Sequence, residues 1–263
     1  MSVYSEDNIE RAVSLILGCG GRIARVSLND SLDFVDAFFA AAAPAGIRVI
    51  LISPYATQPV DVNAYAAQCA AIQQRYAQYN PIWELWNEPN LEFYWGANPN
   101  ATAYTHLAIA TATALRAAGA IDVWSGGTSG IDLAWTKTMI SMGAFEVMNG
   151  CAVHTYEEPC TQYGQYSLLL PLMPSGVEVH TTETCVPSTQ DQPSFLQQMW
   201  YIHRGLGLPT VVWCELRDGT AGHAGAYTLP YGLVYADYVP KPVYYVAQTL
   251  TVPKPNGRAS SVL

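Results

Sequence analysis

Strand-like and helix-like segments alternate along almost the whole chain, and this alternation limits the possible fold more than any other feature. Short apolar or β-branched runs are each followed by a longer amphipathic segment. The expected strands cover residues 3–4, 23–28, 47–52, 81–86, 121–124, 151–156, 177–183 and 210–216. The expected helices cover residues 7–17, 31–43, 62–79, 102–118, 133–148, 194–205 and 241–250, with a short apolar turn at 168–172. Alternation of this kind predicts a parallel sheet.

Eight such strands in a chain of 263 residues predict an α/β fold, a (β/α)8 TIM barrel formed by a single domain over residues 1–251. The first strand is short or degenerate, which leaves open a barrel that is truncated or closed by another chain. Residues 252–263 are rich in Pro, Gly and Ser and are expected to form a flexible tail. The rival fold is an open doubly wound sheet. It is disfavoured because Gly18-Cys19-Gly20 precedes a strand instead of following one.

The composition narrows the class of ligand. The chain is 50% hydrophobic and 13% charged, as expected of a globular domain. Its net charge of −9 argues against nucleic acid and against an anionic membrane surface, and it favours a neutral substrate. No apolar run approaches the ~20 residues that span a bilayer, and the first residues lack the pattern of a signal peptide. Either the chain is not exported by that route, or a leader or upstream domain has been removed.

The cysteines and histidines give no metal or redox motif. Six cysteines are scattered without a C-x-x-C pair, and no H-E-x-x-H occurs. We therefore expect no metal and no organic cofactor. Most of the cysteines are expected to be buried free thiols. Cys160 and Cys185 are both expected just past strand ends, so a disulfide between these two loops stays open.

Two of the expected strands end on a carboxylic acid. Residues 82–90 read Ile-Trp-Glu-Leu-Trp-Asn-Glu-Pro-Asn, an apolar strand that runs into Asn87 and Glu88 and is stopped by Pro89. The run 177–183 ends on Thr182-Glu183. In a barrel the carboxyl ends of the strands form the active face, so these two acids should meet. Two such carboxyl groups are the minimum equipment for cleaving a glycosidic bond.

Other strands bring further polar and aromatic side chains to the same face. The candidates are Arg25, His154, Tyr156, Trp213 and Glu215. Arg25 has an alternative role as a structural partner of Glu84, which shares strand parity with Glu88 and is expected inside the barrel. His154 is either a substrate contact or a core histidine. Trp213 is expected to form a floor under a bound sugar, because an aromatic face can stack on a sugar ring.

Strand 177–183 carries a second set of polar side chains, on the side opposite Glu183. Glu178, His180 and Thr182 alternate with the residues that share the parity of Glu183. Alternation predicts that this side faces the surrounding helices. Because the preceding helical segment is short, we expect this flank to be open to solvent or to a partner.

The motifs at the strand ends resemble those of clan A retaining glycoside hydrolases, most closely members similar to family 39. The segment 86–90, Trp-Asn-Glu-Pro-Asn, is similar to the acid/base motif of the clan, and 182–184, Thr-Glu-Thr, is similar to its nucleophile motif. Near the end of the chain, Leu-Arg-Asp-Gly at 216–219, Gly-Leu at 232–233 and Lys-Pro at 241–242 resemble the segment that follows the eighth strand. The resemblance covers nearly the whole chain.

The resemblance implies a role for each candidate. Glu88 is expected to be the general acid/base and Glu183 the nucleophile. The other candidates are expected to contact the substrate or support these two acids: Asn87 through the sugar 2-OH, Tyr156 and Arg25 through Glu183, and His154, Trp213 and Glu215 around the sugar. The expected activity is hydrolysis of an oligo- or polysaccharide with retention of configuration, on a β-linked hexopyranoside or pentopyranoside or an α-L-arabinofuranoside.

An alternative function remains on the same scaffold. A non-catalytic carbohydrate-binding or assembly domain, for example in a phage tail, would keep the barrel without the reaction. The weak first strand and the polar flank at 178–182 favour this alternative, whereas the presence of both Glu88 and Glu183 argues against it. The chain is expected to act outside the cell or in a phage particle, and to be either independent or part of a larger chain or assembly.

Overall fold

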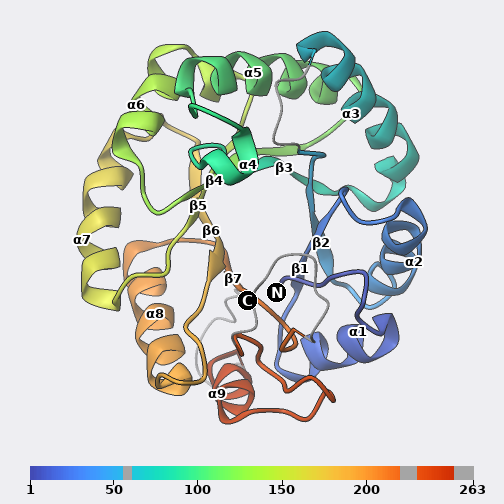
Figure 1. The fold of residues 1–263 in the computed structure, drawn as a ribbon, viewed down its shortest axis with the longest axis vertical. Helices are drawn as coiled ribbons and strands as arrows, with labels where there is room; N and C mark the ends of the chain where they lie inside the picture. The colour runs from blue at the N-terminus through green and yellow to red at the C-terminus, as the bar shows by residue number, and fades with distance from the viewer. Residues whose placement is uncertain (56–60, 220–229, 252–263) are drawn as a thin grey trace.

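The computed structural model describes residues 1–55, 61–219 and 230–251, and these residues form a (β/α)8 barrel. A parallel sheet runs in the order β1 to β7, and helices surround it (Figure 1). The strands are β1 (Ile23–Ser27), β2 (Arg48–Ile52), β3 (Ile82–Asn87), β4 (Asp122–Ser129), β5 (Gly150–His154), β6 (Glu178–Thr184) and β7 (Val211–Trp213). The predicted fold is confirmed. The predicted tail at 252–263 lies outside the described residues.

The first three residues close the barrel between β1 and the segment after β7. Ser2 pairs in parallel with Arg25, and its N–H donates to the carbonyl of Trp213 over 3.2 Å. The carbonyl of Ser2 in turn accepts from the N–H of Leu216 over 3.1 Å. The chain itself therefore supplies the eighth position in the sheet, so neither a truncated barrel nor closure by another chain is needed.

The helices follow the strands as the alternation predicts, with two exceptions. They are α1 (Ile9–Gly18), α2 (Leu32–Ala42), α3 (Val62–Tyr76), α4 (Glu92–Trp95), α5 (Ala101–Ala117), α6 (Leu133–Ser141), α7 (Pro159–Leu169), α8 (Gln192–Leu206) and α9 (Pro242–Thr251), with short 3₁₀ turns at Ala77–Tyr79, Ala144–Glu146 and Leu170–Leu172. The exceptions are the four-residue α4, which the sequence pattern does not predict, and α7, for which it predicts only a turn at 168–172. No helix in the described ranges is both long and apolar enough to cross a membrane.

Side-chain caps fix where six of these helices begin. Each N-cap side chain accepts a hydrogen bond from a backbone N–H three residues ahead, which satisfies a donor that the helix leaves unpaired. The capping residues are Asn8, Ser31, Asp61, Asn100, Asp132 and Asp191. Helix α7 has no such cap and begins with Pro159 in its first turn.

The interior of the barrel changes from apolar to charged along the strand direction. Ile50, Ile82, Trp124 and Val212 form an apolar cluster, on which Ile23 packs. The ring of His180 stacks on Trp124 with centroids 3.6 Å apart. The polar side chains of Arg25, Glu84 and Thr182 form the next layer. Each lies two residues further along its strand than Ile23, Ile82 and His180, respectively. Because alternate residues of a strand share a face, this polar layer lies directly above the apolar one.

Of the polar flank predicted on β6, only Glu178 is exposed, while His180 and Thr182 lie inside the barrel. Beyond Thr181 the strand contains a bulge. Val153 of β5 pairs with Thr181, but the next residue, His154, pairs with Glu183. The extra residue in β6 lets Thr182 and Glu183 reach the same interior, since a bulge breaks the strict alternation of faces. His180 is likewise buried inside the barrel. Helix α7, at 11 residues, is also longer than the short helix from which an open flank is inferred.

Candidate active site at the carboxyl ends of the strands

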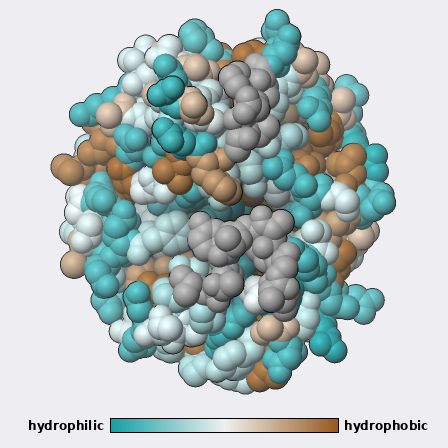
Figure 2. Space-filling model, viewed as in Figure 1, coloured by the Kyte–Doolittle hydropathy of each residue, from teal (hydrophilic) through white to brown (hydrophobic). Residues whose placement is uncertain are grey.

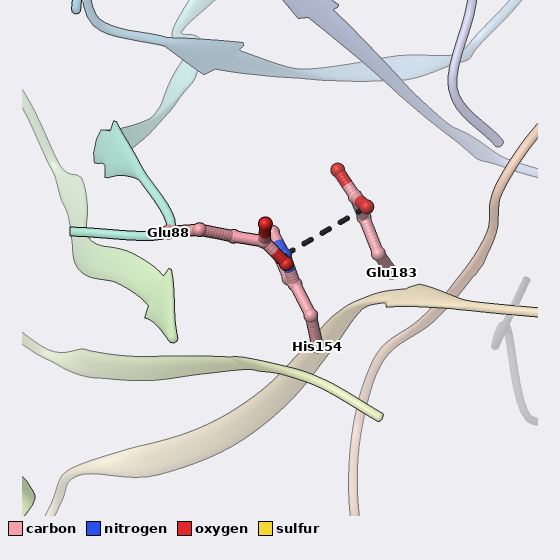
Figure 3. A group of neighbouring side chains, drawn as sticks. All are labelled: Glu88, His154 and Glu183. Atoms are coloured by element: carbon pink, nitrogen blue, oxygen red, sulfur yellow. Dashed lines mark hydrogen bonds and ion pairs between the residues drawn. The ribbon is translucent and has the colours of Figure 1, made fainter. Parts of the chain in front are cut away.

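The three ionisable groups Glu88, His154 and Glu183 converge at the mouth of the barrel from β3, β5 and β6 (Figure 3). One side-chain oxygen of each glutamate and one nitrogen of His154 all lie within 4.8 Å of one another. Nδ1 of His154 lies 3.0 Å from Oε1 of Glu88 and 3.7 Å from Oε2 of Glu183. The two carboxyl groups that the sequence places on separate strands therefore share one site.

The backbone around Glu88 adopts conformations that non-glycine residues seldom take. Glu88 has φ of 41° and Trp86 has φ of 79°, both in the left-handed region. The neighbouring strand allows this because Gly126 and Gly127 lack side chains: a Cβ on Gly126 would overlap the carbonyl of Leu85, and one on Gly127 would overlap the imidazole of His154. Such strained backbone is concentrated at functional sites, where the surrounding structure holds it in place.

Arg25 is the buried cation at the centre of the site. Its guanidinium binds Glu84 through Nε over 2.7 Å and through Nη2 over 3.1 Å. The same group donates from Nη1 to Oε1 of Glu183 and from Nη2 to Oδ1 of Asn87, the latter over 2.9 Å. The sequence leaves two alternatives for Arg25, a structural role with Glu84 and a role in the site beside Glu183. Arg25 has both kinds of contact, because the planar guanidinium presents five donors.

Glu84 anchors this cation from below. Besides Arg25, its Oε1 accepts hydrogen bonds from the hydroxyl of Thr182 over 2.9 Å and from the N–H of Gly127 over 3.2 Å. Burial disfavours its charged form, but the charge of Arg25 and hydrogen bonds from His154 and Arg25 outweigh burial and lower the pKa of Glu84 to about 2. Glu84 is therefore ionised and fully paired, which a buried carboxylate requires.

Glu183 is held as a carboxylate by three neighbours. Burial alone would raise its pKa, but the positive charges of His154 and Arg25 and the hydrogen bond from the Tyr156 hydroxyl lower that pKa below its usual value. Tyr156 donates to Oε2 of Glu183, while Arg25 donates to Oε1. Both oxygens of Glu183 are thus oriented, and the group is prepared to act as a nucleophile or as an anionic ligand.

His154 links the two glutamates electrostatically. Burial disfavours the imidazolium, but the charge of Glu183 and the hydrogen bonds to Glu84 and Glu88 raise the pKa of His154 to about 10. Its Nδ1–H donates to Glu88, while Nε2 lies 3.5 Å from Oε1 of Glu84. A positively charged His154 balances the negative charges that surround it, so this buried cluster is close to neutral.

Two of the predicted site residues are placed differently from the rest. Trp213 is only 1% exposed, packs edge-on against Phe195 of α8 and donates its indole N–H to the carbonyl of Tyr231 over 2.8 Å. It faces the helices, so the prediction that it forms a sugar-binding floor is wrong. Strand parity explains this, because Val212 lies in the barrel interior and Trp213 must then point outward.

Glu215 lies beside the cluster rather than in it. Its side chain is buried and accepts a hydrogen bond from the N–H of Gly219 over 3.2 Å. Burial, with the nearby negative charges of Asp7 and Asp218, raises the pKa of Glu215 to about 8. At neutral pH this carboxyl group therefore carries a proton and can donate to an uncharged ligand.

Two further tyrosines, which are not among the predicted site residues, lie near the site. The hydroxyl of Tyr4 lies 3.9 Å from Sγ of Cys214, and its pKa is raised by burial and by the charges of Cys214 and Glu183. Tyr55 hydrogen-bonds to Ser27, and burial with the charge of Glu183 raises its pKa against the opposing charge of Arg25. Both tyrosines come just after a strand, the same signal that identifies Tyr156.

The site offers donors to a metal ion but has already used them. Within the described ranges, Glu88, His154 and Glu183 form a possible set of three ligands. However, both oxygens of Glu183 and Nδ1 of His154 already make hydrogen bonds, and the Arg25 guanidinium contacts Glu183 directly. A cation would have to displace these bonds and approach another cation. The site therefore suits a neutral, hydroxyl-rich ligand better than a metal.

The Cys160 and Cys185 thiols are both free here, with Cys160 exposed and Cys185 buried.

Comparison with solved structures gives the fold family. The barrel resembles a family 39 glycoside hydrolase from Bacteroides cellulosilyticus WH2, with TM-score 0.78 and 18% identity over 95% of this chain and 62% of that one. It also resembles a monomeric β-xylosidase from Caulobacter crescentus CB15, with TM-score 0.76 and 16% identity over 97% of this chain and 68% of that one. A third is XacCel5A in complex with cellopentaose, with TM-score 0.69, 15% identity and coverage of 94% and 93%.

By sequence, no protein-family profile and no curated protein matches the chain. The chain spans 62% of the length of the Bacteroides protein. Because the sequence identities are below one in five, these likenesses show a shared fold and nothing more. That fold is a (β/α)8 barrel similar to that of the family 39 glycoside hydrolases among these structures.

Proposed function

We propose that the protein is a retaining glycoside hydrolase in which Glu183 is the nucleophile and Glu88 the general acid/base. The observation that carries the proposal is the approach of one oxygen of Glu88 and one of Glu183 to within 4.8 Å. Retaining enzymes place their two carboxyl groups ~5–5.5 Å apart, whereas inverting enzymes keep ~6.5–9.5 Å for a water molecule. The separation thus favours direct attack by a carboxylate.

The first step forms a glycosyl-enzyme. An oxygen of the Glu183 carboxylate attacks the anomeric carbon, and the bond from that carbon to the leaving oxygen breaks. The leaving oxygen takes the proton of the Glu88 carboxyl group. Arg25 and Tyr156 hold the two oxygens of Glu183, so its attacking lone pair is oriented before substrate binds. The products of this step are a free alcohol and an ester between the sugar and Glu183.

The second step returns the enzyme to its starting state. Glu88, now a carboxylate, takes a proton from a water molecule whose oxygen attacks the anomeric carbon, and the ester bond to Glu183 breaks. His154 donates to Glu88 through Nδ1 and stabilises its charged form in this half of the cycle. Two inversions at one carbon give net retention of the anomeric configuration.

The polar groups around the two glutamates suit a sugar. Asn87 is fixed through Oδ1 by Arg25, which leaves its amide N–H groups to bind the sugar 2-OH. Tyr4 and Tyr55 provide further hydroxyl groups near Glu183, and Glu215 provides a carboxyl group near Tyr4. The solved structures that share the fold include a β-xylosidase and a cellopentaose complex. We infer a β-linked pentopyranoside or hexopyranoside in an oligo- or polysaccharide as the substrate.

The non-catalytic alternative loses the two observations that favour it in the sequence. The short first strand pairs on both sides and closes the barrel. The polar side chains of His180 and Thr182 lie inside the barrel against Trp124 and Glu84, so they form no exposed docking flank. What remains is a buried charged cluster in which both acids of the predicted pair are oriented.

The stereochemistry of the product tests the proposal. Hydrolysis of β-D-xylosyl fluoride and β-D-glucosyl fluoride followed by proton NMR should give the β-anomer of the free sugar first. Glu183→Gln should abolish turnover. Glu88→Ala should slow hydrolysis of oligosaccharides by ~10²–10⁴-fold, the usual contribution of a general acid. First appearance of the α-anomer, or full activity in Glu183→Gln, would overturn the assignment.

A further inference from the structure

The turn that follows Glu88 carries the most exposed large apolar side chain among the described residues. Phe93 is 68% exposed and belongs to α4, which lies over the mouth of the barrel beside the end of β3 (Figure 1). Figure 2 shows hydrophobic side chains bordering the hollow in the middle of this face. An isolated exposed apolar residue needs no explanation, but one fixed beside a reactive carboxyl group calls for one.

The α4 turn is held rigidly against the core. Trp95 packs on Trp86 with ring centroids 5.2 Å apart and on Tyr104 at 6.0 Å. The indole N–H of Trp86 donates to the carbonyl of Tyr94 over 3.1 Å. The turn is also tied to Glu88 itself, whose carbonyl accepts from the N–H of Leu91 over 3.0 Å. Phe93 is therefore exposed at a fixed position relative to the Glu88 carboxyl group.

Three aromatic rings run outward from the site to this position. Tyr55, which hydrogen-bonds to Ser27 near Arg25, meets Tyr94 edge-on with centroids 5.6 Å apart at 76°. Tyr94 meets Phe93 edge-on at 4.8 Å and 88°. Edge-to-face contacts keep the outer rings in defined orientations, and the last ring, Phe93, stays largely exposed. The row thus joins the charged cluster to the solvent through aromatic surface.

The position of this row relative to the two acids defines what it can bind. The group that protonates the leaving oxygen must lie on the side of the leaving group. In the proposed mechanism that group is Glu88, and the α4 turn begins shortly after it, at Glu92. The α4 turn is hydrogen-bonded to the backbone of Glu88, which favours the leaving-group side for Phe93 and Tyr94. The apolar faces of a pyranose stack on aromatic rings, which bury the faces while the hydroxyls stay in water.

We propose that Phe93 and Tyr94 form the binding surface for the sugar residues on the leaving side of the scissile bond. The inference rests on the proposed function and adds a substrate class to it: a saccharide with at least one further pyranose beyond the cleaved bond, in preference to a glycoside of a small alcohol. Phe93 lies at the outer edge of this surface, so its ring contributes most to the binding of sugar residues that are distant from Glu88.

Comparison of two kinds of substrate isolates this surface. A glycosyl fluoride has no leaving sugar, so it uses Glu183 and the sugar-binding groups around it, Tyr55 included, but not Phe93 and Tyr94. Xylotriose and cellotriose use both. The variants are Phe93→Ala, Phe93→Trp, which restores an aromatic face, and Tyr201→Ala, a control at a 59% exposed tyrosine of α8.

For the trisaccharide that the enzyme cleaves, Phe93→Ala should lower kcat/KM about tenfold more than it lowers kcat/KM for the matching fluoride, from the loss of one buried aromatic contact. Phe93→Trp should restore the ratio, and Tyr201→Ala should leave it unchanged. Equal effects of Phe93→Ala on both substrates would overturn the inference and leave the glycosidase assignment intact. So would a Phe93→Ala effect confined to concentration-dependent self-association. Wild-type protein that cleaves no fluoride would overturn the proposed function, and this inference with it.

Discussion

Nδ1 of His154 lies 3.0 Å from Oε1 of Glu88, and this contact makes a buried histidine the link between the two acids of the site. Because the donor is an imidazolium, this hydrogen bond to the Glu88 carboxyl group is charge-assisted. The charge of Glu183 and the hydrogen bonds to Glu84 and Glu88 raise the pKa of His154 well above that of a free histidine.

Alkaline stability should depend on His154. Its pKa is raised from 6.5 to about 10, so its stabilising contribution is complete below pH 6.5 and is lost as the pH rises through 10. The free energy of unfolding, measured by urea titration, should fall by roughly 5 kcal/mol from this group across that window. In His154→Gln the fall over the same window should be clearly smaller. An identical alkaline slope in both proteins would show that His154 is neutral in the folded state.

Acid stability should depend on Glu84. The pKa of this carboxyl group is lowered from 4.5 to about 2, so its contribution is present above pH 4.5 and is lost as the pH falls through 2. The expected loss from Glu84 is roughly 3 kcal/mol, seen as a steep acid limb in urea titrations between about pH 5 and 2. Glu84→Gln should be less stable at pH 7, because it leaves Arg25 without its buried carboxylate, but its acid limb should be shallower. A limb of unchanged steepness would contradict the pairing.

Arg25→Lys should shift the pH dependence of catalysis. Lysine keeps a positive charge, but a single ammonium cannot bind Glu84, Asn87 and Glu183 together as the guanidinium does. Weaker stabilisation of the Glu183 carboxylate raises its pKa, so the acid limb of kcat/KM should move to higher pH by about one unit. Activity at low pH therefore falls more than activity at neutral pH. Arg48→Lys, at an exposed ion pair with Asp122, serves as the control and should leave the profile in place.

Gly127→Ala should damage the site more than the fold. A Cβ at Gly127 would overlap the imidazole of His154, which must move away from Glu88 and Glu183. We expect loss of activity on the order of a hundredfold, as for removal of a catalytic proton-transfer group. Gly164→Ala is the matched control, because a Cβ there meets nothing within 4 Å in helix α7, where alanine is the better helix former. Equal activity of the two variants would contradict the tight packing of β4 against His154.

The sequence predicts the barrel and most of the site because both depend on local patterns. An apolar strand that ends in a polar residue places that residue at the mouth, and this applies to Arg25, Glu88, His154 and Glu183. The pairing of Arg25 with Glu84 follows from strand parity in the same way. These predictions need only the period of two that a strand imposes.

The other predictions fail where the sheet departs from that period or where long-range contacts determine the structure. The bulge in β6 brings Thr182 and Glu183 to one interior, and alternation alone cannot show it. Trp213 faces the helices because Val212 faces the interior, a choice of register that the short β7 does not reveal. Helix α7 lacks a side-chain cap and a clear apolar stripe, so its pattern resembles a loop.

Covalent labelling tests the central claim most directly. The protein would be incubated with 2-deoxy-2-fluoro-β-D-xylosyl and 2-deoxy-2-fluoro-β-D-glucosyl fluorides and then measured by intact mass and peptide mapping. We predict a single sugar adduct on the peptide that contains Glu183, absent in Glu183→Gln and retained in Glu84→Gln. An adduct on another carboxyl group, or hydrolysis of the parent fluorides with inverted configuration and no adduct, would contradict Glu183 as the nucleophile.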